Sequence, residues 1–333
     1  MLEQILTVGF VTAFLTASVR MAVPLIYAGL GETISEKAGI LNIGMEGVML
    51  GGAFFSFAGT FYSGSLAVGL LCGMAGGAMV SAIHGLLSIR LAQDQSVSGI
   101  AINIFMAGVT SFLYKLMSSG QSYQQIEPFA KLKIPFLGDI PLIGNALFNQ
   151  DVLTYGVYVL VILVTLFYSR TSKGMAFAAI GENPRAADSA GIPVHWYQWA
   201  AVLLNGMLGG LGGAYLVLVQ VGNFSENMTS GRGYIALAAV ILGRYVPFGM
   251  MGAAFIFGAA NALQIRLQAI GVPLPTQALA MMPYIITRLP FWAPSAKTAR
   301  RRHWASRISG EPGRGDCPHV HFYLLVAFQS HVV

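Results

Sequence analysis

The chain has 333 residues, of which 55% are hydrophobic and only 10% are charged, whereas about 25% of residues are charged in an ordinary soluble domain. This composition, with a mean hydropathy of +0.66, excludes a soluble globular protein and indicates an integral membrane protein. The net charge of +6 does not indicate a nucleic-acid partner, because residues 1–287 carry 12 Lys and Arg against 11 Asp and Glu, and the excess positive charge lies in residues 288–333.

Apolar runs of about 20 residues, the length that a helix needs to cross the hydrocarbon core, recur along most of the chain. Many of the 40 glycines lie within these runs, where small residues let helices approach one another closely. We therefore predict an all-α polytopic membrane protein with about ten transmembrane or partly spanning helices. The expected helices lie near residues 4–19, 20–34, 45–62, 66–89, 96–115, 151–169, 197–220, 233–245, 247–265 and 274–288.

Two of these helices are expected to be broken or incomplete crossings. The helix at 20–34 contains Pro24 and Glu32, and the helix at 233–245 is short and ends at Arg244, shortly before a proline. Membranes tolerate such breaks only where protein or a water-filled cavity covers the exposed backbone.

The stretch SEKAGILNIGMEGVMLGG at residues 35–52 places Asn42 and Glu46 inside an apolar run. A charged carboxyl at bilayer depth costs a few kcal/mol and usually faces a cavity or a polar partner. Glu46 therefore has three interpretations: it contacts a substrate, it caps the helix that begins near residue 45, or it pairs with Lys37.

Further polar side chains interrupt the apolar helices, and a polar solute could bind them in transit. The candidate substrate-pathway residues are Asn42, Glu46, Gln95, Ser98, Asn103 and Asn205. The alternative is that these side chains form hydrogen bonds between helices, where each bond is worth about 0.6 to 2 kcal/mol. The sequence offers no catalytic pair, and its two cysteines, Cys72 and Cys317, do not have the spacing of metal ligands.

The most informative polar segment is SRTSKGMAFAAIGENPRAADSAGIPVHWYQ at residues 169–198. Within it, Asn183 and Pro184 indicate a helix start, because proline suits the first helical turn. A short run of helix formers follows, and Gly191 indicates a helix end. The order predicts a short helix that lies outside the membrane.

This segment resembles a known family. The residues Gly181-Glu182-Asn183-Pro184, Ala186-Ala187 and Ala190-Gly191-Ile192 resemble the cytoplasmic coupling loop of ABC importer permeases of the ribose and branched-chain amino acid type. Together with GETISEKAGILNIGMEGVMLGGAF (31–54) and QSVSGIAIN (95–103), they are similar, more narrowly, to the nucleoside or guanosine permeases that work with a basic-membrane-protein type lipoprotein. The resemblance covers about residues 1–287.

The resemblance implies the fold of a type II-like ABC importer permease in the inner or plasma membrane of a prokaryote. It implies four partners: a cytoplasmic ABC ATPase that binds ATP and Mg²⁺, a second related permease, an external substrate-binding lipoprotein, and a nucleoside or similar solute. It also implies that a cytoplasmic coupling loop at 170–195 contacts the ATPase. The coupling residues would be Glu182, Asn183, Pro184, Arg185, Ala186, Ala187, Asp188 and Gly191.

The chain itself carries no G-x-x-x-x-G-K-[ST] motif for phosphate binding, so we expect a transport subunit that holds no cofactor of its own and is not an enzyme. Two other transport functions stay open: an ABC permease for a sugar or another small polar solute, and an ion-coupled transporter with Glu32, Glu36 and Glu46 as coupling carboxylates. The loop at 117–150 is expected on the external face, as a docking site for the lipoprotein or as a plain connection.

The last 46 residues depart from the family pattern. After residue 287 the family would continue its last helix, but this chain turns to the basic, histidine-containing sequence RLPFWAPSAKTARRRHWASRISG. We interpret residues 1–287 as the transmembrane permease domain and residues 288–333 as an atypical basic tail from a frameshift or an altered 3′ end.

This interpretation predicts that the gene encodes an apolar continuation in another reading frame just after codon 287. Resequencing the locus tests it, because recovery of that continuation supports a frameshift, whereas an intact frame that encodes the basic tail contradicts it.

Overall fold

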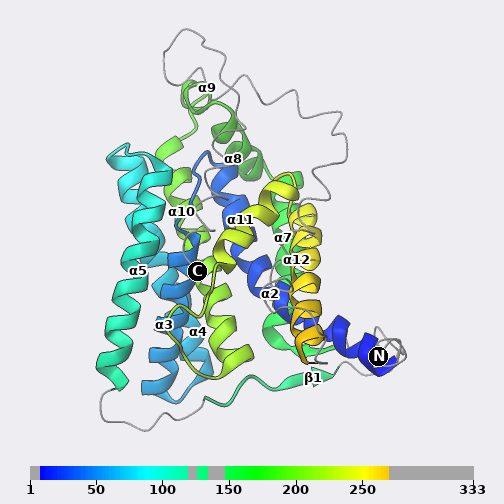
Figure 1. Cartoon of the computed structure of the whole chain (residues 1–333). Helices are drawn as coiled ribbons and strands as arrows, with labels where there is room; N and C mark the ends of the chain where they lie inside the picture. Colours follow the sequence, from blue (N-terminus) through cyan, green and yellow to red (C-terminus); the bar gives the residue numbers. More distant parts are fainter. Residues whose placement is uncertain (1–7, 119–125, 134–146, 270–333) are drawn as a thin grey trace. The chain divides into compact units, whose positions relative to one another are not determined.

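The computed structural model describes residues 8–118, 126–133 and 147–269, and these residues are almost entirely helical (Figure 1). The helices are α2 (Val8–Lys37), α3 (Met45–Ser63), α4 (Leu66–Gly85) with its π-helical end η1 (Leu86–Arg90), α5 (Gln95–Ser118), α7 (Val152–Arg170), α8 (Ser172–Glu182), α9 (Pro184–Ser189), α10 (Val194–Tyr215) with its π-helical end η2 (Leu216–Val221), α11 (Arg232–Leu242) and α12 (Pro247–Ala269). Strands β1 (Lys131–Lys133) and β2 (Asn149–Asp151) pair antiparallel, with Leu132 opposite Gln150.

The apolar pattern predicts most helices to within a few residues. Six helices in the described ranges are long and apolar enough to cross a membrane, and α11 is a shorter apolar helix, as expected for 233–245. These spans confirm the predicted all-α polytopic membrane protein. The helix expected at 274–288 and the tail at 288–333 lie outside the described residues.

The expected division between helices at 4–19 and 20–34 is wrong, because α2 is one continuous helix of 30 residues with Pro24 inside it. The expected division fell at Arg20, the first residue of the helix predicted at 20–34. Instead the Arg20 guanidinium donates a hydrogen bond to the carbonyl oxygen of Val219 at 2.9 Å, and the Gln220 side chain donates to the Arg20 carbonyl at 2.6 Å. The end of η2 therefore satisfies Arg20 and the helix continues past it.

Helices α3, α4 and α10 pack against one another through glycines. A Cβ atom at Gly52 would collide with the backbone of Gly210, and a Cβ atom at Gly210 would collide with Gly73. Gly77 likewise lies against Gly206 and Gly210, and no side chain separates these backbones. Such close approach brings many atoms into van der Waals contact, which drives helix association where lipid is as apolar as the helix surface.

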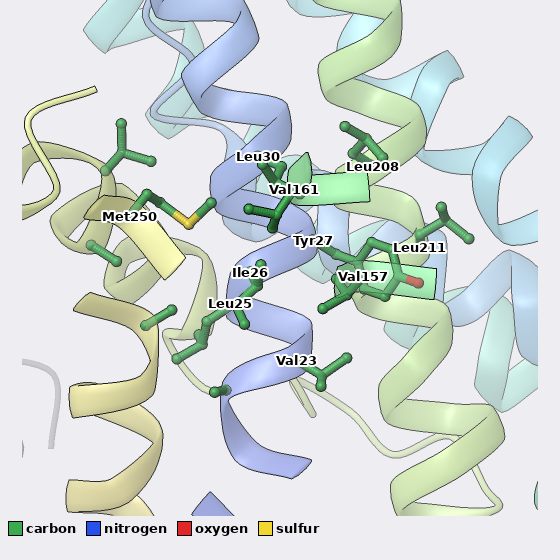
Figure 2. Packing of buried hydrophobic residues seen from close by; sticks show 14 of the residues in the cluster. Val23, Leu25, Ile26, Tyr27, Leu30, Val157, Val161, Leu208, Leu211 and Met250 are labelled. Atoms are coloured by element: carbon green, nitrogen blue, oxygen red, sulfur yellow. The ribbon is translucent and has the colours of Figure 1, made fainter. Parts of the chain in front are cut away.

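Helix α2 crosses this group and joins it to α7, α11 and α12. Its buried side chains, which include Leu25, Ile26 and Leu30, form a hydrophobic core with Val157 of α7 and Met250 of α12 (Figure 2). Tyr27 brings the polar end of its ring into this core, and its hydroxyl donates to the carbonyl oxygen of Leu153 at 2.7 Å.

The loop expected at 117–150 lies partly in the described residues, at the opposite end of the helices from α9 (Figure 1). The N–H of Ile126 donates to the carbonyl oxygen of Gly222 at 2.8 Å, which fixes this segment to the end of η2. Asp151 caps α7 by accepting the N–H of Thr154 at 2.9 Å, and it also accepts the hydroxyl of Tyr215 at 3.2 Å. Asp151 thereby connects the start of α7 to the end of α10.

We predict that Gly210→Ala lowers the melting temperature of the detergent-solubilised protein, because overpacking of this kind costs about 1 to 3 kcal/mol. Gly252→Ala in α12 is the matched control, since no described atom beyond its chain neighbours and the nearby backbone of its own helix lies within 4 Å of its Cβ position. The control should be as stable as the parent or more stable by up to about 1 kcal/mol, because alanine favours helix. Equal melting temperatures for the two variants would contradict the packing described for α10.

Candidate functional site

Two helices begin beside the middle of α10 rather than beside one of its ends. Gly209 lies near the middle of the 28-residue span Val194–Val221 and packs against Met45 and Val48, the first turn of α3. Gly233, in the first turn of α11, packs against the backbone of Glu46. Helices α3 and α11 therefore both start at about the mid-depth of α10. Their first turns carry backbone N–H groups that no preceding helical turn satisfies.

The carboxylate of Glu46 caps α11. It accepts the N–H of Gly231 on Oε1 and the N–H of Gly233 on Oε2, both at 2.7 Å, and Glu46 is only 8% exposed. We expected Glu46 to cap α3, the helix that contains it, but its carboxylate accepts N–H groups of α11 instead. The physical role, a negative charge at a helix start, is the same. The expected pairing with Lys37 is also wrong, because Lys37 lies with its Nζ 4.8 Å from the centroid of the Tyr168 ring.

Glu32 has a parallel role at the loop between α2 and α3. Its Oε1 accepts the N–H of Asn42 at 2.8 Å, and its Oε2 accepts the side-chain amide of Asn205 at 2.7 Å. All three residues are at most 1% exposed. Within the described residues, both side-chain polar atoms of Asn42 and the Oδ1 of Asn205 have no hydrogen-bond partner. The cluster thus contains spare donor and acceptor groups.

Asn103 of α5 connects this loop to α11. Its Oδ1 accepts the N–H of Gly47 at 2.7 Å, and its Nδ2 donates to the carbonyl oxygen of Ile43 at 3.0 Å and to the hydroxyl of Tyr234 at 2.7 Å. One buried amide therefore fixes the start of α3 and orients a tyrosine of α11.

Gln95, Ser98 and His84 complete the cluster on its other side. The Gln95 Oε1 accepts the N–H of Leu41 at 2.8 Å, and the His84 Nε2 lies 3.1 Å from the carbonyl oxygen of Leu41. The Ser98 hydroxyl lies 3.4 Å from His84 Nδ1.

The structure thus brings all six candidate pathway residues to one place around residues 41–47. Most of their hydrogen bonds go to backbone groups in the loop before α3 and in the first turns of α3 and α11. These bonds agree with the alternative to substrate contact, which is hydrogen bonding between helices. Their role in a substrate pathway stays a prediction. The sequence pattern does not assign His84, Arg232 or Tyr234 to this group of side chains, although the arginine in GRGY before a short apolar helix is a usable signal.

The short helix expected near 182–192 is present as α9 (Figure 1). Asn183 caps it by accepting the N–H of Ala186 at 3.0 Å, Pro184 occupies its first turn, and Gly191 follows with a φ of +80°. Of the eight expected coupling residues, Ala187 is buried and Pro184 is half-buried. The exposed ones are Glu182, Asn183, Arg185, Ala186, Asp188 and Gly191.

Helix α8, which was not predicted, holds α9 against the rest of the chain. Its buried Phe177 makes edge-on ring contacts with Phe167 of α7 and Tyr197 of α10, at centroid distances of 5.8 and 5.0 Å. At the end of α8, Gly181 abuts the backbone of Lys37 and Gly39, where α2 ends. A displacement of α9 would therefore reach the loop between α2 and α3 directly.

Comparison with known proteins gives consistent results. A model of the family described as "Branched-chain amino acid transport system / permease component" matches residues 14–287. The guanosine ABC transporter permease protein NupQ of Bacillus subtilis is 37% identical over 292 residues, covering 85% of this chain and 92% of that protein.

Two further relatives have the same level of similarity. The nucleoside ABC transporter permease protein NupC of Lactococcus lactis is 36% identical over 274 residues, covering 79% of this chain and 86% of that protein. The putative glucose ABC transporter permease protein TsgC13 of Haloferax volcanii is 36% identical over 274 residues, covering 81% and 82%.

We predict that Glu46→Ala lowers the free energy of unfolding by about 2 kcal/mol or more, because it leaves two N–H groups of α11 without an acceptor inside the protein. Glu46→Gln should lose less, because its amide oxygen still accepts one of them. Thermal unfolding in detergent measures both changes.

Glu226→Ala is the control for this prediction, since Glu226 forms an exposed ion pair with Lys115 at 3.4 Å, and exposed pairs contribute about 0 to 1 kcal/mol. If Glu46→Ala is no more destabilising than Glu226→Ala, Glu46 does not stabilise the start of α11.

Proposed function

This chain belongs to the family of branched-chain amino acid transport system permease components, and we propose that its cargo is a nucleoside. It is a multi-pass membrane subunit of an ABC importer. We propose further that a separate cytoplasmic ATPase binds ATP and Mg²⁺ and powers transport, that a second related permease completes the pathway, and that an external lipoprotein delivers the nucleoside.

One observation supports the nucleoside above all: two relatives named for guanosine and for nucleosides are 36–37% identical to this chain over most of its length. A third relative of similar identity is named as a putative glucose permease, so a sugar is the second candidate cargo. Both cargoes are uncharged and rich in hydrogen-bonding groups.

The geometry of α9 supports the separate ATPase. The helix is capped at both ends and is mostly exposed, and the side chains of Arg185 and Asp188 are available to a partner. Because α8 fixes α9 to the ends of α2, α7 and α10, a push on α9 would move these helices as rigid elements.

An ion-coupled mechanism with Glu32, Glu36 and Glu46 has less support. Glu32 and Glu46 each accept two hydrogen bonds from groups that would otherwise be unsatisfied inside the membrane. This structural role accounts for both carboxylates without transport of an ion.

The proposal predicts ATP-dependent uptake of labelled guanosine into proteoliposomes that contain this chain with its neighbouring permease, ATPase and lipoprotein. Arg185→Glu should reduce both uptake and the ATPase activity of the assembled complex by about tenfold or more. It replaces the positive charge of α9 by a second negative charge beside Asp188, which opposes docking to the ATPase surface. Arg90→Glu, at the exposed end of η1, is the matched control and should reduce them much less.

If the complex takes up glucose but not guanosine, the cargo is a sugar and not a nucleoside. Uptake that continues without ATP and collapses with the proton gradient would contradict the ATP-driven mechanism. Arg185→Glu behaving like Arg90→Glu would remove α9 as the contact with the ATPase.

A further inference from the structure

Two polar side chains beside Glu46 and Asn103 are only partly buried within the part of the chain that the structure describes. Arg232 and Tyr234, in the first turn of α11, are both half-buried, whereas Glu46 and Asn103 beside them are at most 8% exposed. The start of α11 lies beside the middle of α10, a helix long and apolar enough to cross a membrane, so these two residues lie far from the ends of that span. A charged or polar side chain at this depth faces a water-filled path or another protein surface rather than lipid.

The hydroxyl of Tyr234 has a defined orientation. It accepts a hydrogen bond from the Asn103 amide at 2.7 Å, and the other bonds of that amide, to Gly47 and Ile43, prevent it from turning. Within the described residues the hydroxyl donates no hydrogen bond of its own. The proton of Tyr234 is therefore free for an acceptor that arrives from outside the chain, and its ring offers a flat apolar face.

Arg232, two residues before Tyr234 in the first turn of α11, adds further donors. Its Nη1 donates to the carbonyl oxygen of Met228 at 3.0 Å. A guanidinium has five N–H donors in a fixed plane, so one bond to the backbone leaves others for a ligand.

We propose that Tyr234 and Arg232 line the translocation path and contact the base of a purine nucleoside as it passes. This proposal rests on the proposed function and adds the residues that meet the cargo. The ring of Tyr234 stacks on the base, and the guanidinium donates to acceptors such as O6 and N7 of guanine. Discontinuous helices near the midplane are a general setting for such contacts.

The first test measures access from water. In a background of Cys72→Ser and Cys317→Ser, Tyr234→Cys and Arg232→Cys should react with a small, charged, membrane-impermeant thiol reagent in the resting or the vanadate-trapped complex, and guanosine should slow the reaction. Ile104→Cys is the matched control, because Ile104 is adjacent to Asn103 and 71% exposed on the surface of an apolar helix. If Tyr234→Cys and Arg232→Cys are both as unreactive as Ile104→Cys, the proposal is wrong.

The second test measures selectivity in the reconstituted complex with saturating lipoprotein. Tyr234→Leu should lower the maximal rate of guanosine uptake by about tenfold relative to uridine, since purines lose the larger stacking surface, and Tyr234→Phe should retain most of the ratio. Tyr62→Leu, at a residue that is 74% exposed near the end of α3, should leave the ratio unchanged.

The outcomes separate this inference from the proposed function. If the parent complex carries guanosine and the guanosine-to-uridine ratio is the same in Tyr234→Leu, the inference fails and the proposed function stands. If the parent complex carries glucose but no nucleoside, both fail. If Tyr234 has only a structural role, Tyr234→Leu and Tyr234→Phe should lower the amount of folded protein without altering the guanosine-to-uridine ratio.

Discussion

The hydrogen bonds from the start of α11 to Glu46 are the interaction on which the interior of this protein depends. Inside a bilayer, no water is available to satisfy the N–H groups at the first turn of a helix, so a helix can begin there only if the protein supplies an acceptor. Glu46 supplies two acceptor oxygens to α11, and Glu32 supplies one to the loop before α3. The two carboxylates that look most out of place in the sequence are therefore what permits broken helices at this depth.

Close packing of the helices determines where these side chains can reach. The glycines on the facing surfaces of α3, α4 and α10 bring the three backbones together. Short polar side chains such as Asn103 and Asn205 then span the distance between helices. A chain with larger residues at these crossings would need longer polar side chains, at a greater entropic cost.

The sequence predicts the features that depend on local pattern. Apolar length predicts the helices, and the order of Asn183, Pro184 and Gly191 predicts α9. The sequence also indicates that the six polar side chains within apolar helices need hydrogen-bond partners. It does not predict those partners, because Glu46 is separated from Gly231 by 185 residues and nothing local indicates the pairing. The continuity of α2 past Arg20 is missed for the same reason, since its acceptor at Val219 is 199 residues away.

The glycine contacts also restrict how the transporter can change shape. Backbones in direct contact have no layer of flexible side chains between them, so α3, α4 and α10 cannot slide past one another without steric collision. During a transport cycle these three helices must then move together as one rigid body. Helix α2 makes the same kind of contact with α10, because a Cβ atom at Gly31 or at Gly212 would meet the backbone of the other helix, so α2 has to move with this group as well.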